Sequence, residues 1–161
     1  MKNYFLNYIE QLKINKPINI YFDMDGVIVD YDLINHRLTQ NEENTFLNKR
    51  PIYTVIEILN NLQNKENIRI HILSITRYKN QIEGKIKWLE KYLPFINTNN
   101  IHIFSREEYN FVHPKIIKSK YLEENTNNEE INIHIDDDHQ VLKELINNKK
   151  IIPLHVSSIL D

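Results

Sequence analysis

Five short runs of β-branched and aliphatic residues, each separated from the next by a segment of helical periodicity, constrain the fold of this chain most strongly. Runs rich in Ile and Val are typical of buried strands. Strands that alternate with helices are joined by right-handed crossovers and form a parallel sheet. The sequence therefore predicts an α/β fold with a five-stranded parallel sheet flanked by helices. The expected strands are Ile18–Phe22, Ile68–Leu73, Ile101–Phe104, Ile131–Ile135 and Ile151–Val156.

The segments around these runs have the apolar spacing of amphipathic helices. Residues 3–13 are expected to form one such helix, packed on the body of the protein. Pro51 is expected in the first turn of a second helix, and Pro114 is expected to open another. Further helical stripes run through residues 82–93 and 141–146. Because none of the loops is long enough to be a domain linker, the 161 residues are expected to form one domain.

Composition excludes several classes of site. The chain has no cysteine, which rules out thiolate metal sites and disulfides. It has only two glycines, Gly26 and Gly84, which rules out a Gly-rich phosphate loop. Its 20 Lys and Arg against 22 Asp and Glu give a net charge of −2. Proteins that bind nucleic acid through their overall charge are instead strongly basic. The sequence shows neither a signal peptide nor a membrane-spanning run, so we expect a cytoplasmic protein with no membrane partner.

Acidic residues follow two of the expected strands. Asp23 and Asp25 come directly after the first, and Asp136, Asp137 and Asp138 end the fourth. Ligands of parallel α/β sheets bind beyond the carboxyl ends of the strands. Carboxylates gathered there repel one another unless a cation joins them, and oxygen ligands without sulfur favour Mg²⁺. Either cluster alone could be a solvated acidic loop, but that explanation is poor for two clusters at matching strand ends.

The segment Tyr21–Val27, which reads YFDMDGV, resembles the first motif of the haloacid-dehalogenase-like (HAD) phosphatases, and the other three motifs follow in order. The resemblance implies a Rossmann-like sheet with strand order 5-4-1-2-3. It also implies that Asp23 is a nucleophile that forms an aspartyl-phosphate and that Asp25 is the general acid/base. Asp25 can hold a proton at neutral pH only if neighbouring negative charge raises its pKa.

Two further motifs supply polar contacts to the phosphoryl group. Ser74 follows the second expected strand and is implied to donate to a phosphoryl oxygen, with Thr76 as the alternative. The third motif is a lysine, which neutralises the phosphoryl group as a compact point charge. Among Lys115, Lys118 and Lys120, the family pattern of apolar residues at +3 and +4 selects Lys118. The implied substrate- and phosphate-binding residues are Ser74, Ile75, Thr76, Arg77 and Lys118.

The fourth motif is an apolar strand followed by two aspartates. By resemblance, Mg²⁺ is held by the side chain of Asp23, the backbone carbonyl of Asp25 and the side chain of Asp137. Asp136 would act mainly through water, and Asp138 is expected to be peripheral.

Four histidines lie inside expected strands and could suggest a zinc site. Because they lie on different strands and away from the carboxyl edge, we interpret them as satisfied interior or surface side chains. They are His71, His102, His134 and His155.

Substrate choice in HAD phosphatases depends mainly on cap insertions. Residues 31–50 leave room for only a minimal cap, which implies an open site that admits nucleotides or the end of a polymer. The expected partner is a small phosphorylated substrate. The pattern from Asp23 to Asp30 is similar to that of the 5'(3')-deoxyribonucleotidases. The layout of Ser74, Arg77 and Lys87–Leu89 is similar to the phosphatase domain of phage polynucleotide kinase–3'-phosphatases. The sequence therefore predicts a Mg²⁺-dependent phosphomonoesterase acting on a nucleotide.

Three other functions stay open. One is a polynucleotide 3'-phosphatase, which would act on a nucleic-acid end. Another is a non-catalytic phosphate- or metal-binding protein on the same fold, although such a protein would be expected to have lost part of the acidic set. The third is a phosphotransferase, for which a short cap would exclude water poorly.

Overall fold

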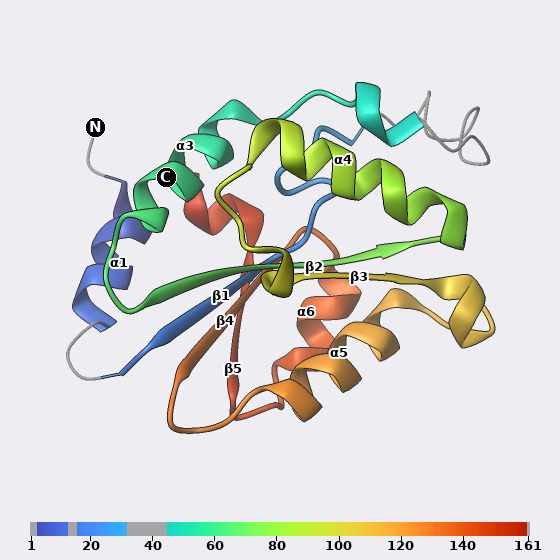
Figure 1. Ribbon diagram of the computed structural model, residues 1–161. Helices are drawn as coiled ribbons and strands as arrows, with labels where there is room; N and C mark the ends of the chain where they lie inside the picture. The colour runs from blue at the N-terminus through green and yellow to red at the C-terminus, as the bar shows by residue number, and fades with distance from the viewer. Residues whose placement is uncertain (1–2, 13–15, 32–44, 161) are drawn as a thin grey trace.

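The computed structural model describes residues 3–12, 16–31 and 45–160, and they build an α/β fold around one parallel sheet (Figure 1). The strands lie in the order β3-β2-β1-β4-β5. This is the predicted order, 5-4-1-2-3, read from the opposite edge, so the fold class is confirmed. The strands are β1 (Ile18–Phe22), β2 (Ile68–Thr76), β3 (Ile101–Ser105), β4 (Ile131–Asp136) and β5 (Ile151–His155).

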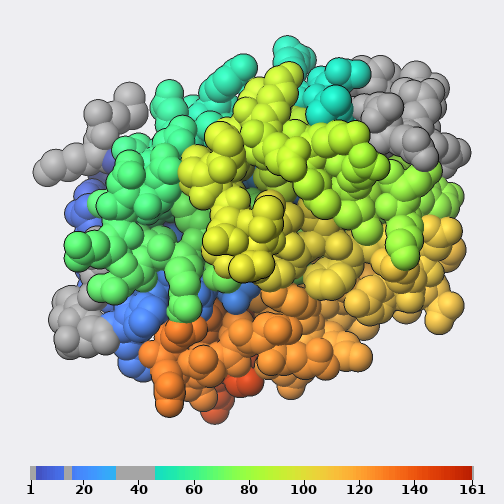
Figure 2. Space-filling model, in the orientation of Figure 1, coloured from blue at the N-terminus to red at the C-terminus, as the bar shows by residue number. Residues whose placement is uncertain are grey.

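Helices cover both faces of the sheet. Helices α1, α3 and α4 lie on one face and α5 and α6 on the other (Figure 1). Each layer has its own apolar core, one built around Ile9, Leu59 and Trp88, and the other around Leu122 and Val141. In the space-filling view, the green surface that includes α3 lies above the orange surface of α5, with the yellow surface of the segment after α4 between them (Figure 2). The helices are α1 (Tyr4–Leu12), α3 (Tyr53–Gln63), α4 (Ile82–Tyr92), α5 (Pro114–Asn125) and α6 (His139–Leu145).

Strand β1 occupies the centre of the sheet, and all five of its residues are buried. Its last residue, Phe22, pairs with Ile72 of β2 on one side and with Ile135 of β4 on the other. The next backbone N–H, that of Asp23, donates to the carbonyl of Ile135 at 3.0 Å. This register brings Asp23 and Asp136 to the same edge of the sheet, side by side.

Two local predictions differ from the structure. Strand β2 does not end at Leu73 but continues to Thr76, because its last five residues pair with β3. Ser74 therefore lies inside the strand. Pro51 is not in the first turn of α3, which begins at Tyr53; it forms an antiparallel bridge with Val29 in the segment after β1.

The predicted cap, residues 31–50, falls largely outside the described residues, because 32–44 are not among them. Its last part forms a short 3₁₀ helix, η1 (Thr45–Asn48), which packs on α4. There Trp88, fully buried, donates its indole N–H to the carbonyl of Lys49 at 2.9 Å. The Phe46 ring meets the same indole edge-on. Among the described helices, none has the length and apolarity needed to cross a bilayer.

Candidate active site

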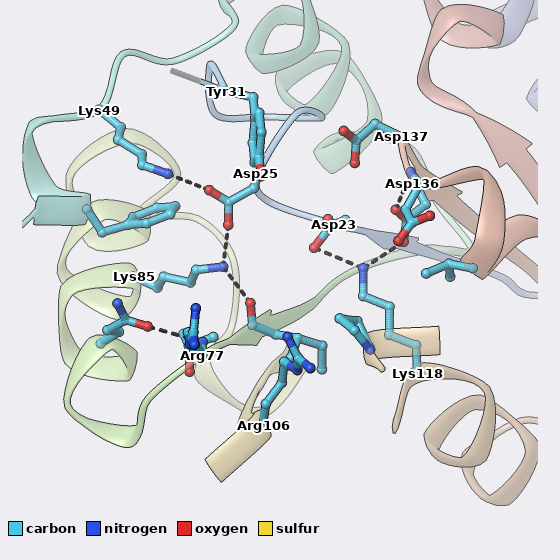
Figure 3. A pocket seen from close by; sticks show the side chains of 17 residues that line it. Asp23, Asp25, Tyr31, Lys49, Arg77, Lys85, Arg106, Lys118, Asp136 and Asp137 are labelled. Carbon is cyan, nitrogen blue, oxygen red and sulfur yellow. Dashed lines mark hydrogen bonds and ion pairs between the residues drawn. The ribbon is translucent and has the colours of Figure 1, made fainter. Parts of the chain in front are cut away.

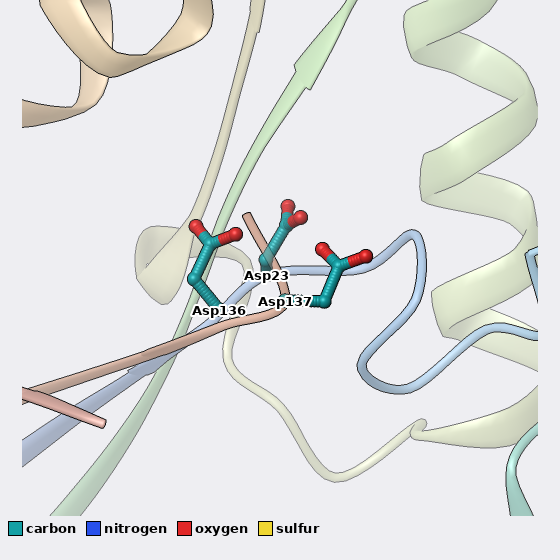
Figure 4. Close-up of side chains that lie close together, drawn as sticks. All are labelled: Asp23, Asp136 and Asp137. Carbon is teal, nitrogen blue, oxygen red and sulfur yellow. The ribbon is translucent and has the colours of Figure 1, made fainter. Parts of the chain in front are cut away.

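Three carboxylates meet at the carboxyl edge of β1 and β4. Asp23, Asp136 and Asp137, called here the acidic triad, each place one oxygen within 4.8 Å of the others (Figure 4). Asp23 is 7% exposed, and Asp136 is completely buried. The structure thus brings together the two acidic clusters that are 113 positions apart in the sequence.

Two members of the acidic triad, Asp23 and Asp137, carry negative charge that their surroundings do not fully stabilise. Burial raises the pKa of Asp23, and the carboxylates of Asp136 and Asp25 raise it further, against the opposing effect of Lys118. Burial, together with Asp23 and Asp136, raises the pKa of Asp137 to about 6. Buried hard oxygen donors with excess negative charge suit Mg²⁺, so the residues present fit the cation that the fold family implies. Asp23 and Asp137 would hold it, with Asp136 behind them.

Lys118 joins two members of the triad. Its ammonium lies 3.1 Å from Oδ1 of Asp23 and 2.6 Å from Oδ2 of Asp136, and it is buried. Burial alone would lower its pKa, but the two carboxylates raise the pKa above its ordinary value. The competing lysines point elsewhere: Lys115 pairs with Glu144 at 3.7 Å, and Lys120 pairs with Glu124 at 4.0 Å. The geometry therefore favours Lys118, as the family pattern does.

Asp25 lies between two lysines. Lys49 and Lys85 each place Nζ 2.6 Å from one of its carboxylate oxygens (Figure 3). Burial alone would raise the pKa of Asp25, but the ammonium groups of Lys85 and Lys49 outweigh burial and hold the pKa well below its usual range. The condition of a pKa raised by negative neighbours is not met, because the nearest charges are positive. In the absence of substrate, Asp25 is a carboxylate at neutral pH.

A cavity of about 480 Å³ opens beside these groups (Figure 3). From the end of β2, Ile75, Thr76 and Arg77 line it. Ser74 is fully buried within the strand, where its hydroxyl oxygen accepts from Lys85 at 2.8 Å. The hydroxyl of Thr76 donates to backbone carbonyls at 2.9 and 3.3 Å. The phosphate-binding role of both hydroxyls stays a prediction.

Comparisons with known proteins fit this topology. No protein-family model matches the chain, and no curated protein matches it in sequence. A chain of the Pnkp1/Rnl/Hen1 RNA repair complex superposes with a TM-score of 0.67 and 16% identity, over 88% of this chain and 43% of that one. A chain from a second structure of the Pnkp1/Rnl/Hen1 complex superposes with a TM-score of 0.66 and 17% identity, over 88% of this chain and 47% of that one. This chain therefore spans less than half the length of those two neighbours.

A haloacid dehalogenase-like hydrolase from Burkholderia xenovorans LB400 superposes with a TM-score of 0.56 and 10% identity, over 86% of this chain and 81% of that one. The chain has the haloacid-dehalogenase-like fold. The resemblance drawn from the sequence motifs is thereby confirmed for the architecture, and the acidic triad lies at the carboxyl edge of a HAD-fold sheet.

Sequence reasoning missed two lysines of this HAD-fold site. Lys85 lies on the buried face of α4 with Trp88 and Leu89. Its spacing of three and four residues from these two apolar side chains was the available signal that it lies on the buried face, although a helical lysine is most often solvated. Lys87, which the motif layout singled out, is half exposed and pairs with Glu83. Lys49 follows η1, and no pattern in the sequence marks it.

His134 is an interior histidine, as expected, but it lies close enough to the carboxyl edge to contact the acidic triad. It is fully buried, and its Nε2 lies 2.9 Å from Oδ2 of Asp136. Within the described part of the chain its Nδ1 has no hydrogen-bond partner, so we place the proton on Nε2, which donates to Asp136. Residues two apart on a strand share a face, and this spacing could have revealed the contact. Burial would raise the pKa of Asp136, but Lys118 and His134 lower it.

Gly26 sets the position of Asp137. Its φ is +75°, and a Cβ added there would lie 2.2 Å from Oδ2 of Asp137. We expect Gly26→Ala to lower the free energy of unfolding by about 1–2 kcal/mol through the left-handed backbone alone. Displacement of Asp137 should also weaken Mg²⁺ binding. Thermal unfolding and calorimetric Mg²⁺ titration check this, with Gly84→Ala in α4 as a comparison that lacks the positive φ; unchanged Mg²⁺ affinity in Gly26→Ala would contradict it.

Proposed function

We propose that this protein is a Mg²⁺-dependent phosphomonoester hydrolase that acts on nucleotides and uses Asp23 as its nucleophile. One observation carries the proposal: the Asp23 carboxylate faces the cavity with Lys118 on one side and the other triad members beside it. A carboxylate held against a buried ammonium and a cation-binding cluster is suited to attack a phosphoryl group, because both positive charges attract the substrate anion.

The chain's own residues account for the steps of the proposed reaction. A carboxylate oxygen of Asp23 attacks phosphorus, the bond to the leaving oxygen breaks, and an aspartyl-phosphate forms. Lys118 neutralises charge on the phosphoryl oxygens. Mg²⁺, when bound, would screen the same oxygens from the carboxylates. Water then attacks phosphorus, and Asp23 is released as a carboxylate.

Asp25 is proposed to move the protons. As a carboxylate it is ready to accept the proton of the attacking water. To protonate the leaving oxygen it must first gain a proton, and the incoming phosphate favours that gain because its negative charge opposes Lys49 and Lys85.

A second candidate function is a polynucleotide 3'-phosphatase. It is favoured by the structural likeness to chains of an RNA repair complex. The retention of Asp23, Asp25, Asp136 and Asp137 argues against a third candidate, a non-catalytic protein of this fold.

The proposal is tested by phosphate release with Mg²⁺, using the Asp23→Asn variant as the blank. The panel holds 5'- and 3'-mononucleotides, a 3'-phosphorylated oligonucleotide and several sugar phosphates. Preference for mononucleotides supports the nucleotidase, and preference for the oligonucleotide supports the second candidate. No release above the blank, with Mg²⁺ binding confirmed, would support the non-catalytic protein.

Metal removal and pH should act on stability together. Because the pKa of Asp137 is about 6, this carboxyl is increasingly protonated below pH 6 and then binds a cation poorly. We expect Mg²⁺ to raise the unfolding temperature at pH 7.5, EDTA to reverse the rise, and the rise to shrink at pH 5. Without metal, Asp137 makes stability depend on pH in the opposite direction. Its raised pKa means that the folded state binds the proton more tightly than the unfolded state does, so the free energy of unfolding falls as pH rises from 4 to 6. Thermal unfolding across pH measures both, and an equal Mg²⁺ effect at pH 5 and 7.5 would contradict the assignment.

A further inference from the structure

Charge divides the cavity into two halves. One half holds the acidic triad, Asp138 and Lys118. The other half holds Asp25 and a set of four cations, called here the cationic wall: Lys49, Arg77, Lys85 and Arg106. Four cations against one carboxylate leave this half with a formal charge of +3. In Figure 3, Lys49 and Lys85 reach Asp25, and Arg77 and Arg106 lie apart from Asp25, farther from Asp136 and Asp137.

The cationic wall is held in place by the protein. The side chains of Lys85 and Lys49 are only 3% and 9% exposed and are fixed by Asp25. Arg106 donates from Nε and Nη2 to the carbonyls of Val112 and Phe111 at 2.8 and 2.5 Å. Carbonyl oxygens orient the guanidinium and leave its charge in place.

Arg77 follows β2 and lies beside the segment that carries Arg106. Its backbone N–H donates to Gln81 and its carbonyl accepts from the N–H of Glu107, so the loop that carries it is tied at two points. Its guanidinium lies 5.5 Å from the centre of the Tyr78 ring. The wall is therefore a preorganised positive surface, which favours anion binding because little order must be created on binding.

Other residues hold the scissile phosphate, which affects Lys49 and Lys85 only through its charge. In the proposed function it is bound at Asp23 between Lys118 and the cation site, in the other half of the cavity. We propose that the cationic wall binds a second anionic group of the substrate, so that the preferred substrate is a phosphomonoester whose leaving group carries another phosphate. This rests on the proposed function and adds the substrate class: a nucleoside bisphosphate or a phosphorylated oligonucleotide end, which share that chemistry.

Binding to the Asp23→Asn variant with Mg²⁺ tests the inference without turnover. By calorimetry, thymidine 3',5'-bisphosphate should bind about tenfold or more tightly than thymidine 3'-monophosphate or 5'-monophosphate, the scale of one added charge-assisted hydrogen bond. The advantage should shrink between 50 and 500 mM KCl because salt screens charge. The same affinities are also measured on the unaltered chain in EDTA. Equal affinity for the bisphosphate and both monophosphates overturns the inference.

A 3'-phosphorylated thymidine dinucleotide separates the two sources of the second anion. Binding at least as tight as the bisphosphate identifies an oligonucleotide end, and weaker binding identifies a nucleoside bisphosphate. Arg77→Gln and Arg106→Gln should each reduce the bisphosphate advantage. Lys120→Gln removes the same charge from the exposed face of α5 and should leave the advantage unchanged. An advantage unaffected by both arginine variants counts against the cationic wall.

Turnover of the same ligands by the unaltered chain distinguishes a failure of the proposed function from a failure of the inferred subsite. A binding advantage without phosphate release overturns the proposed function and supports the subsite. Phosphate release without any bisphosphate advantage overturns the subsite and supports the proposed function.

Discussion

Replacing Asp23 by asparagine is expected to reduce phosphate release by at least about a thousandfold, because the amide cannot attack phosphorus. The fold should remain intact. Burial and the neighbouring carboxylates raise the pKa of Asp23, which means that its charged form is costly in the folded protein. A neutral side chain of the same shape removes that cost, and Lys118 keeps Asp136 as a partner at 2.6 Å. The unfolding temperature of Asp23→Asn should therefore equal or exceed that of the unaltered chain.

Asp138→Asn is the matched control for this prediction. It makes the same chemical change at another aspartate that lines the cavity. The Asp138 side chain caps α6 by accepting from the N–H of Gln140 at 2.8 Å, and asparagine caps helices equally well. Phosphate release and thermal unfolding are measured on both variants. Comparable turnover by Asp23→Asn and Asp138→Asn would rule out Asp23 as the nucleophile.

Replacing Lys118 by alanine is expected to damage both activity and stability. Its ammonium is the buried partner of Asp23 and Asp136, and its loss leaves two buried carboxylates close together without a cation between them. Breaking a buried ion pair in this way costs about 3–5 kcal/mol of unfolding free energy. The phosphoryl group also loses the cation that neutralises it, so the rate should fall at least about a hundredfold.

Two other lysines of α5 make the comparison specific. Lys115→Ala and Lys120→Ala remove the same group from the same helix, but their partners, Glu144 and Glu124, are surface carboxylates. Surface pairs contribute about 0–1 kcal/mol, so both variants should stay within about twofold of the unaltered rate. Urea unfolding and phosphate release measure the three variants together. A larger loss in Lys115→Ala or Lys120→Ala than in Lys118→Ala would show that the motif lysine is misassigned.

The parts of this protein that could be predicted from sequence are those fixed by periodicity and by position along the sheet. Ile/Val runs determine strands, alternation with helices determines a parallel sheet, and residues at strand ends then converge. Asp23, Asp136 and Asp137 follow from that reasoning, and apolar residues after Lys118 indicate which face of α5 docks on the sheet.

The charges around Asp25 could not be predicted in the same way. Lys85 can be buried because its ammonium donates hydrogen bonds to Asp25 and Ser74. These partners lie 60 and 11 positions away in the sequence. Lys49 reaches the same carboxylate from the residue after η1, where the sequence has no periodicity. Both the residues and the direction of the pKa shift of Asp25 depend on tertiary contacts. The length of β2 depends likewise on pairing with β3, which local sequence does not encode.

The position of Trp88 has a practical consequence for every experiment above. It is the single tryptophan of the chain, it is buried, and its indole N–H is bonded to the backbone of Lys49, whose side chain reaches Asp25. An indole whose hydrogen bond is tied to a residue that lines the cavity is an intrinsic fluorescent probe of that cavity. Ligands that displace Lys49 from Asp25 would change its emission, so binding to the unlabelled protein can be followed in solution and in stopped flow.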